Sequence, residues 1–276
     1  MSAVRLICFD LDGTLIDSQN QVHPRVWDAA RQAQAAGLHL AICTGRPALG
    51  QTKAYAEHLD PTGWHIFQGG ASLLNVASSQ DLSTPLPDGA LDYLKALRQQ
   101  HGWALELYSG LDYVCDQIVD DSEASQLAIA HAELLKLEYQ PRPLDSLQGT
   151  LVRAQWVVSD AQLEPVMATA TEQLHYASAT SPSLPGIHFV SVTAQGIDKC
   201  SAIRKLAEEV FGYGLDQTMM VGDGQNDLSA MRMVKYPVAM ANGHPEVLEL
   251  CPYQVGHVDQ GGAADAIALA MQLNQG

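Results

Sequence analysis

The N-terminal quarter of the chain alternates short apolar runs with helical segments, and this alternation constrains the fold more than any other feature. The strand candidates lie at 4–9, 38–43 and 64–67, and the helix candidates between them at 24–36 and 48–59. Strands joined through helices are typical of βαβ units, in which the strands lie parallel in one sheet. The beginning of the chain therefore predicts a parallel α/β core.

The same order of elements returns near the C-terminus, whereas the middle of the chain differs. The late candidates are a helix at 198–211, a strand at 218–221, a strand at 236–240 and a helix at 262–273. Between 83 and 188, strands come in adjacent pairs, at 104–108 with 112–116 and at 175–179 with 187–192, which favours an antiparallel or mixed sheet. The predicted organisation is a discontinuous core domain, 1–83 and 192–276, with an inserted α/β domain at 84–191.

Length, charge and cysteine content exclude several classes of protein. A chain of 276 residues is long enough for about two domains. Its formal net charge of −16 counts against nucleic acid or an anionic membrane as a partner. No apolar run is long enough for a transmembrane helix. The five cysteines are odd in number and scattered, which is typical of the reduced thiols of a cytoplasmic protein. We expect the protein to be a monomer or a weak homodimer.

A pair of acidic residues follows the first predicted strand directly, within the motif D-L-D-G-T at 10–14. In an open parallel sheet, ligands bind outside the carboxyl ends of the strands, where this motif is expected to lie. Asp10 and Asp12 are two residues apart around a turn, so both carboxylates can face one ligand. One is suited to be a nucleophile or metal ligand and the other a proton donor. Taken alone, the motif leaves open a turn without function.

A second acidic motif, G-D-G-Q-N-D at 222–227, follows the predicted strand at 218–221. We expect Asp223 and Asp227 to join the first pair at the same edge of the sheet. Four carboxylates in one crevice repel one another unless a cation lies between them. Mg²⁺ prefers oxygen ligands and keeps part of its water shell, so it suits this set and would attract a phosphate group.

Two further positions are suited to hold an anion. The run T-G-R at 44–46 ends a predicted strand and offers a hydroxyl group and backbone N–H groups to phosphate oxygens. Lys199 opens a predicted helix, so its ammonium group and the helix N-terminus can both face an anion. Each signal alone has a structural alternative, a capping threonine or a solvated lysine. Together with the acidic motifs, they point to a phosphate site.

The ordered set D-x-D-G-T-L, T-G-R, Lys199 and G-D-G-x-N-D resembles the four motifs of the haloacid dehalogenase-like hydrolases. The run P-V-A-M-A-N at 237–242 resembles the V-A-M-x-N run of the Cof-like branch. Only 32 residues separate Asp12 from Thr44, but 155 separate Thr44 from Lys199, so the insertion follows the second motif. That is where the type-II caps of this family lie. The resemblance implies a Rossmann-like parallel-sheet core with an inserted α/β cap of the C2B-like kind.

The resemblance also implies phosphoryl transfer through an aspartyl-phosphate, with defined roles for the motif residues. Asp10 would be the nucleophile, and Asp12 would protonate the leaving group and then activate water. The implied ligands of Mg²⁺ are Asp10, the backbone carbonyl of Asp12, Asp223 and Asp227. The implied phosphate-binding residues are Thr44, Gly45, Lys199 and Asn226.

Asp12 separates two chemistries within the family. Members that act on carbon–halogen bonds lack this second carboxylate, whereas a phosphate ester has a poor leaving group that needs an acid. The resemblance therefore favours a Mg²⁺-dependent phosphatase of a small phosphorylated metabolite, either a sugar phosphate or a cofactor-type phosphate. The alternatives are a phosphotransferase or phosphomutase, and a non-catalytic metabolite-binding domain on the same fold.

Substrate contacts are expected from the cap and from loops beside the motifs. The candidates within or beside cap strands are Tyr108, Tyr113, Trp156 and His188. The candidates in the core are Arg46 and Asn242. Each cap candidate has core packing or ordinary surface as its alternative, and Arg46 has a bracing ion pair. The sequence Q-G-G-A at 68–71 departs from the Asn-Gly-Ala common in the branch, which predicts an altered contact there.

Overall fold

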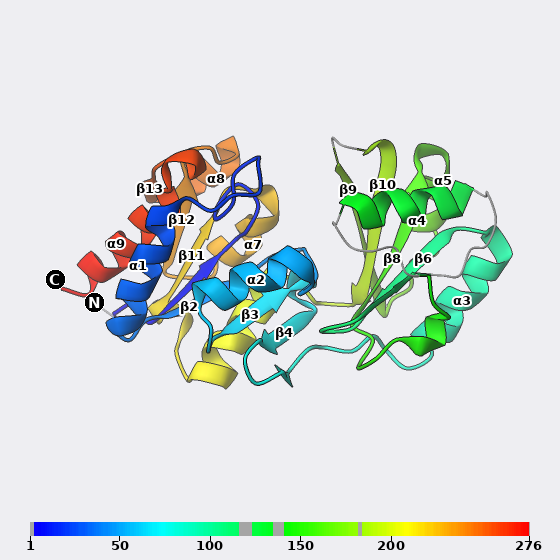
Figure 1. The fold of residues 1–276 in the computed structure, drawn as a ribbon, viewed down its shortest axis with the longest axis horizontal. Coiled ribbons are helices and arrows are strands. Elements are labelled where there is room, and N and C mark those ends of the chain that lie inside the picture. The colour runs from blue at the N-terminus through cyan, green and yellow to red at the C-terminus, as the bar shows by residue number, and fades with distance from the viewer. Residues whose placement is uncertain (1–2, 116–122, 135–140, 182–183, 276) are drawn as a thin grey trace. The chain divides into compact units, whose positions relative to one another are not determined.

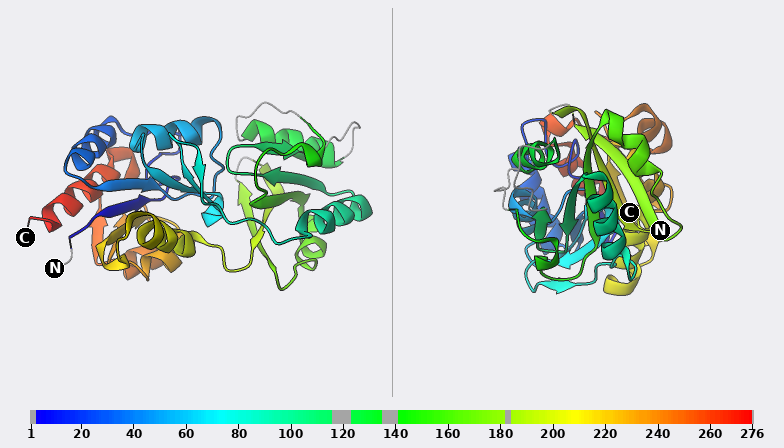
Figure 2. Two further views of the ribbon diagram at one scale, coloured as in Figure 1. Left: turned by 90° about the horizontal axis from the view of Figure 1, so that it is seen from below. Right: turned by 90° about the vertical axis from the view of Figure 1, so that its right-hand side faces the viewer.

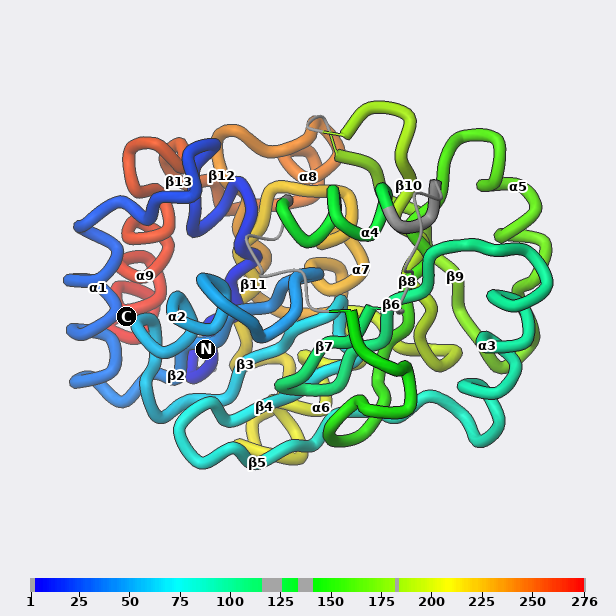
Figure 3. The backbone as a smooth tube through the Cα atoms, turned by 45° about the vertical axis from the view of Figure 1, so that its right-hand side comes forward, coloured from blue at the N-terminus to red at the C-terminus, as the bar shows by residue number. Residues whose placement is uncertain are grey.

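The computed structural model describes residues 3–115, 123–134, 141–181 and 184–275. The chain divides into two compact units, which we describe separately. Unit 1 comprises Met1–Arg46, Gln51–Leu82 and Asp198–Gly276, and unit 2 comprises Pro47–Gly50 and Ser83–Ile197. Unit 1 is thus built from both ends of the chain, as the blue and the orange-to-red parts of the tube show (Figure 3). Across the described ranges, every helix falls short of the length and apolar character that a membrane span requires.

The core of unit 1 is a five-stranded parallel sheet in the order β13-β12-β11-β1-β2. Its strands are β1 (Leu6–Phe9), β2 (His39–Ile42), β11 (Thr218–Gly222), β12 (Tyr236–Met240) and β13 (Tyr253–Val255). Strand β1 lies between β2 and β11, with Phe9 level with Ile42 on one side and with Val221 on the other. The carboxyl ends of these strands therefore meet at one edge, which confirms the predicted parallel α/β core.

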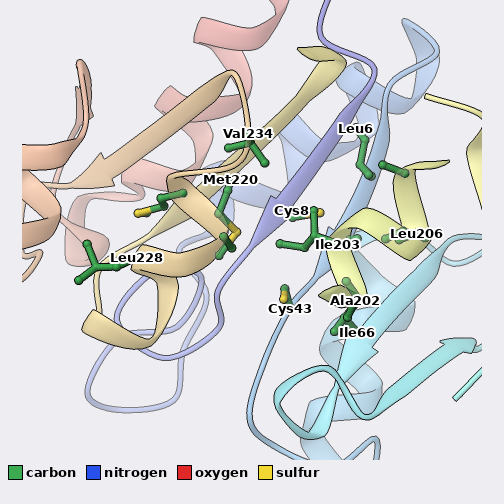
Figure 4. Packing of buried hydrophobic residues seen from close by; sticks show 14 of the residues in the cluster. Leu6, Cys8, Cys43, Ile66, Ala202, Ile203, Leu206, Met220, Leu228 and Val234 are labelled. Carbon is green, nitrogen blue, oxygen red and sulfur yellow. The ribbon is translucent and has the colours of Figure 1, made fainter. Parts of the chain in front are cut away.

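Helices cover both faces of this sheet (Figures 1 and 2). On one face lie α1 (Pro24–Ala35) and α9 (Gly262–Leu273). On the other face lie α6 (Lys199–Lys205), α7 (Leu228–Met231) and α8 (Pro245–Leu250). Helix α6 continues as a π-helical segment, Leu206–Phe211. The strand side chains alternate between the faces, so Leu6 and Cys8 of β1 both point toward α6. There they pack with Ile203 and Met220 in a fully apolar cluster (Figure 4). The first residue of α6, Lys199, is thereby fixed beside the sheet edge.

The third predicted strand does not join the parallel sheet as a full member, so that part of the prediction is wrong. Strand β3 (Trp64–Phe67), which follows α2 (Gly50–Leu59), pairs antiparallel with β4 (Ser72–Asn75), and β4 pairs with β5 (Gln80–Asp81). One parallel bridge, between Cys43 and Ile66, joins this small sheet to the end of β2. The reversal occurs at 68–70, where Gln68 and the two glycines have positive φ. A chain that turns back so tightly pairs with itself before a crossover helix can form.

Unit 2 contains a five-stranded sheet in the order β7-β6-β8-β10-β9, and every neighbouring pair is antiparallel. Its strands are β6 (Ala104–Tyr108), β7 (Tyr113–Cys115), β8 (Arg153–Ser159), β9 (Leu174–Ser181) and β10 (Leu184–Ala194). Its helices are α3 (Ala90–His101), α4 (Glu123–Leu134) and α5 (Asp160–Met167). The antiparallel sheet confirms the expectation from paired strands. Helix α5 ends at Met167, and just beyond it the Thr169 hydroxyl donates to the Val166 carbonyl at 2.7 Å.

The two faces of this second sheet differ in polarity. One face packs α3 and α5 over a large apolar cluster that includes Trp156, Leu105 and Val190. The other face carries Glu106, whose carboxylate is fully buried although it bears a charge. A buried carboxylate is tolerated only when donors surround it.

Among the residues that the structure describes, four side chains donate to the buried carboxylate of Glu106. Tyr108 Oη lies 2.7 Å from Oε2, Tyr113 Oη 3.2 Å from Oε1, and Gln155 Nε2 3.0 Å from Oε2. His131 Nδ1, from α4, lies 2.8 Å from Oε1. Burial alone would raise the pKa of Glu106, but His131 and the hydrogen bonds lower it below its ordinary value. This network joins α4 to the polar face of the sheet.

Replacing Glu106 with glutamine is expected to reduce the free energy of unfolding by about 2 kcal/mol at pH 7, because a neutral amide pairs poorly with four donors. Because the pKa of Glu106 is lower in the folded protein than in the unfolded chain, its charge contributes to the free energy of unfolding at pH values above the unfolded-state pKa. This contribution is lost as pH falls through the folded-state pKa. The gap between wild type and variant, measured by urea denaturation, should therefore close in acid. Glu164→Gln, at an exposed position on α5, is the matched control. A gap that persists unchanged in acid would contradict the charged network.

Candidate active site

Three carboxylates meet at the carboxyl edge of the parallel sheet in unit 1. Asp10 follows β1 directly, Asp223 follows β11, and Asp227 ends the 3₁₀ turn Gln225–Asp227. One oxygen from each lies within 4.8 Å of the other two. The register of β1 and β11 brings them together, since the backbone N–H of Asp10 donates to the carbonyl of Val221 at 2.9 Å. Asp10 and Asp227 are buried and Asp223 is half-buried.

Lys199 inserts its ammonium group between two of these acids. Its side chain is 4% exposed, and Nζ pairs with Oδ1 of Asp10 and, at 2.7 Å, with Oδ1 of Asp227. Asp198 caps α6 by accepting a hydrogen bond from the backbone N–H of Ser201 at 2.8 Å, which fixes where the helix begins. The second oxygen of Asp227 accepts from the backbone N–H groups of Asp223 and Gly224. Asp227 is thus held on both sides.

The electrostatics of this cluster favour a bound cation. Burial, and then the charge of Asp227, raise the pKa of Asp10 well above its ordinary value, although Lys199 opposes the shift. Burial likewise raises the pKa of Asp223 to about 6, against a hydrogen bond from Thr14. Burial alone would lower the pKa of Lys199, but Asp10 and Asp227 raise it above its usual range. One ammonium group for three crowded carboxylates leaves negative charge to be neutralised.

The loop after β1 is shaped by Gly13 and Thr14. Gly13 has a φ of +78°, and a Cβ placed there would lie 2.2 Å from Oδ2 of Asp223. Thr14 Oγ1 donates to Oδ1 of Asp223 at 3.1 Å. The glycine therefore permits the loops after β1 and β11 to touch, and the threonine orients the Asp223 carboxylate. Sequence reasoning assigned Thr14 no role, although it stands within the D-x-D-G-T motif.

Asp12 departs from the expectation that four carboxylates gather in one crevice. The side chain of Asp12 is 56% exposed. Its carboxylate pairs with the guanidinium group of Arg46, and Arg46 Nε lies 3.0 Å from Asp12 Oδ2. Arg46 also donates to Oδ1 of Asn20 at 3.0 Å, and Tyr55 Oη donates to the carbonyl of Asn20 at 2.5 Å. The structure thus contains the ion pair named as the alternative for Arg46, and its contact with substrate stays a prediction. Sequence spacing carries no signal for Asn20 or Tyr55.

Thr44 lies buried at the end of β2, beside the turn that follows β3. Its Oγ1 accepts from the backbone N–H of Arg46 at 3.1 Å, and its carbonyl accepts from Gly69 at 2.9 Å. In the same turn Gly70 has a φ of +110°, and a Cβ there would lie 2.2 Å from the carbonyl oxygen of Asp198. Only glycine lets this turn approach the start of α6 so closely. The turn at 68–70 thus packs against the backbone at Asp198 and Lys199, where α6 begins.

The remaining predicted site residues lie in different surroundings. Asn226 is exposed on the 3₁₀ turn that carries Asp227, and the side-chain amide of Asn242 contacts backbone at Gly13 and Val258. In unit 2, His188 Nε2 lies 2.8 Å from Oδ1 of Asp160, on the sheet face that packs α5. Tyr108 and Tyr113 belong to the Glu106 network, and Trp156 is part of the apolar core.

The donor set of the acidic cluster fits a hard divalent cation. Asp10, Asp223 and Asp227 supply carboxylate oxygens at mutually close distances, and Asp223 reaches the solvent. Mg²⁺ usually binds through one or two carboxylates and keeps several waters, and the half-buried position of Asp223 leaves one side of the cluster open to water. A parallel α/β sheet with such a cluster at its carboxyl edge and a buried lysine beside it is the arrangement that the resemblance to haloacid dehalogenase-like hydrolases implies.

The chain belongs to the haloacid dehalogenase-like hydrolase family, which it matches over residues 7–267. It is 22% identical over 276 residues to 5-amino-6-(5-phospho-D-ribitylamino)uracil phosphatase YwtE of Bacillus subtilis, covering 95% of this chain and 96% of that protein. It is 24% identical over 263 residues to the HMP-PP phosphatase of Yersinia pseudotuberculosis, covering 94% and 93%. The match is therefore with whole proteins.

Solved structures share the fold along almost the full chain. A haloacid dehalogenase-like hydrolase from Bacteroides thetaiotaomicron superposes with a TM-score of 0.81 at 24% identity, covering 96% of this chain and 99% of its own. The subclass IIB sugar phosphatase BT4131 superposes with a TM-score of 0.74 at 20% identity, covering 98% and 100%. These likenesses confirm the fold class predicted from the sequence.

Proposed function

We propose that this protein is a Mg²⁺-dependent phosphatase that hydrolyses a phosphate ester of a small metabolite through an aspartyl-phosphate on Asp10. The observation that carries the proposal is the position of Asp10, at the centre of the acidic edge and paired with Lys199. Relatives named as phosphatases match along nearly their whole length, which supports the same class of reaction here.

Asp10 is suited to be the nucleophile because it directly follows β1, at the carboxyl edge of the sheet where ligands of such sheets bind. In the proposed reaction, one oxygen of Asp10 forms a bond to phosphorus while the bond from phosphorus to the ester oxygen breaks. Water then attacks the phosphoaspartate, releasing phosphate and regenerating the carboxylate. Lys199, held by Asp10 and Asp227, supplies positive charge beside the transferring group.

The metal would be held by Asp10, Asp223 and Asp227, together with the backbone carbonyl of Asp12 that the family resemblance implies. When bound, Mg²⁺ neutralises charge on the phosphate oxygens. The side chain of Thr44 and the backbone of Gly45 lie at the end of the neighbouring strand β2 and are proposed to bind those oxygens, with Asn226. Asp227 orients Lys199 as well as completing the acidic set.

Asp12 is proposed to protonate the leaving alkoxide and then to take a proton from the attacking water. In the structure its carboxylate is engaged by Arg46. Arg46 engages both carboxylate oxygens, so the side chain must leave this pair to reach a leaving group. The exposed position of Asp12 allows that rotation without disturbing buried groups.

Unit 2 is proposed to be the cap that selects the substrate, corresponding to the inserted domain predicted at 84–191. Its size and antiparallel sheet fit such a role. The compounds named for the relatives, such as the ribitylamino-uracil phosphate, are small phosphorylated metabolites. A sugar phosphate or a cofactor-type phosphate is the proposed substrate class, and a cytoplasmic location agrees with such a substrate.

Hydrolysis of a panel of phosphate esters, with Mg²⁺ and with EDTA, tests the proposal. We expect release of inorganic phosphate that stops on chelation and returns when Mg²⁺ is restored. Activity that is independent of a divalent cation would contradict the metal assignment. Transfer of the phosphoryl group to an added sugar would identify a phosphotransferase instead, and the absence of turnover on every ester would favour a binding domain.

Replacing Asp12 with asparagine is expected to lower kcat on alkyl phosphates by about 10²–10⁴-fold, because these leaving groups need an acid. With p-nitrophenyl phosphate, whose phenolate leaves unaided, we expect a burst of about one equivalent per enzyme followed by slow turnover, since water activation still needs the base. Asp17→Asn is the control, because Asp17 lies in the same loop and its carboxylate accepts from the backbone N–H groups of Gln19 and Gln21. Equal losses on both substrates without a burst would contradict the assignment.

A further inference from the structure

The segment 241–244, between β12 and α8, contacts both acidic loops although it contains no acidic residue. The side-chain amide Nδ2 of Asn242 donates to the carbonyl oxygen of Gly13 at 2.7 Å. Two residues later, the backbone N–H of His244 donates to the carbonyl oxygen of Asp223 at 2.8 Å. The segment therefore joins the loop after β1 to the loop after β11 at their backbones.

The orientation of the Asn242 amide is determined by its two partners. The backbone N–H of Val258 donates to Oδ1 of Asn242 at 3.0 Å, while the Gly13 carbonyl can only accept. Oδ1 must therefore face Val258 and Nδ2 must face Gly13. An aspartate in this position would keep the acceptor for Val258 but would set a second oxygen against the carbonyl of Gly13.

The position of Gly13 decides how the acids face one another. Gly13 packs directly against the carboxylate of Asp223, and the next residue, Thr14, donates to the same carboxylate at 3.1 Å. Asp12 precedes Gly13, so a shift of the Gly13 peptide moves groups on both sides of the acidic edge. The hydrogen bond from Asn242 is the contact that holds this peptide from the side of β12.

We propose that Asn242 is a positioning residue that keeps the acidic loops after β1 and β11 at the spacing a divalent cation requires. The inference rests on the proposed function. It gives Asn242 the role of holding the loop backbone at Gly13, in place of the substrate contact expected from sequence. Residues that orient metal ligands typically change metal affinity or activity by about 10–100-fold when they are replaced. Replacing Asn242 should therefore lower kcat by a similar factor on every substrate.

Asn242→Asp and Asn242→Ala test the proposal, with Mg²⁺ binding to the ester-free protein measured by calorimetry. We expect the Kd for Mg²⁺ to rise about tenfold or more in both variants, with Asn242→Asp at least as impaired as Asn242→Ala. We also expect kcat to fall by a similar factor on every ester of the panel, with KM little changed. An unaltered Mg²⁺ affinity, or a change in KM for one ester only, would overturn the proposal.

Asn75→Asp provides the matched control within unit 1. Asn75 makes the same pair of backbone hydrogen bonds, from Nδ2 to the Thr62 carbonyl at 2.9 Å and from the Ser78 N–H to Oδ1 at 3.0 Å. It lies opposite Trp64, the first residue of β3, at the far end of that strand from the turn beside Thr44. We expect a lower Tm with unchanged Mg²⁺ affinity.

Two outcomes separate this inference from the proposed function. If Asn75→Asp and Asn242→Asp lose Mg²⁺ affinity in proportion to their loss of Tm, Asn242 acts only through stability and the inference fails. If the wild type binds Mg²⁺ but hydrolyses no ester, the proposed function fails while the comparison of affinities still decides the role of Asn242. A wild-type protein that binds no divalent cation would overturn both.

Discussion

Replacing Asp10 with asparagine is expected to reduce phosphate-ester hydrolysis by at least about 10⁴-fold, because removal of a covalent nucleophile leaves only binding and electrostatic effects. The amide has nearly the same shape as the carboxylate but cannot attack phosphorus. The loss should be the same on alkyl and aryl phosphates, since Asp10 displaces either leaving group by forming its bond to phosphorus. Steady-state phosphate release on both kinds of ester measures it.

The stability of Asp10→Asn distinguishes loss of chemistry from loss of fold. The pKa of Asp10 is raised by burial and by Asp227, so the folded protein disfavours its charged form relative to the unfolded chain. A neutral amide avoids that penalty, and Lys199 keeps its pairing with Asp227 at 2.7 Å. We therefore expect a Tm without Mg²⁺ equal to or above that of the wild type. Substantial activity in a folded Asp10→Asn protein would contradict the aspartyl-phosphate.

The acidic edge could be predicted from the sequence because parallel strands bring their carboxyl ends together. Asp10, Asp223 and Lys199 are each adjacent to an element end, so predicting the strands and one helix was enough to place them near one another. The spacing between motifs likewise gave the interval, Thr44 to Lys199, in which an insertion was expected. Local pattern and topology carry this information, because register in a buried sheet follows from its apolar residues.

Side-chain partners beyond the motifs could not be predicted, because sequence spacing does not encode them. Asp12 was expected within the acidic crevice, but Arg46 of the neighbouring loop holds its carboxylate at the surface. Asn242 was predicted as a substrate contact, and the two backbone hydrogen bonds of its amide had no signal in the sequence. Strand β3 was expected in the parallel sheet, but the left-handed residues at 68–70 turn it back on itself. Each difference depends on a contact formed only in the folded chain.

Replacing Lys199 with methionine is expected to cost about 3–5 kcal/mol of unfolding free energy without divalent cation, because it leaves buried carboxylates with no cationic partner. Lys199 is the shared partner of Asp10 and Asp227, which lie on the elements that follow β1 and β11. Methionine keeps most of the apolar stem, so the change isolates the ammonium group. Urea denaturation in EDTA measures the loss, and Lys205→Met, on the same helix with Nζ bound to the Leu82 carbonyl, is the control.

Added Mg²⁺ and a second substitution then identify the cause of that loss. A cation that binds the folded acids stabilises the native state by mass action, so Mg²⁺ should raise the Tm of Lys199→Met more than that of the wild type. Asp10→Asn combined with Lys199→Met removes one carboxylate along with the ammonium group, so the double variant should be less destabilised than the sum of the two single changes. If the two substitutions change the free energy of unfolding additively, and the Tm of Lys199→Met does not respond to Mg²⁺, the claim that the acidic edge needs a positive charge is contradicted. We expect activity to stay low in every Lys199 variant even where Mg²⁺ restores the fold, because the ammonium group is also proposed to supply positive charge beside the transferring phosphate.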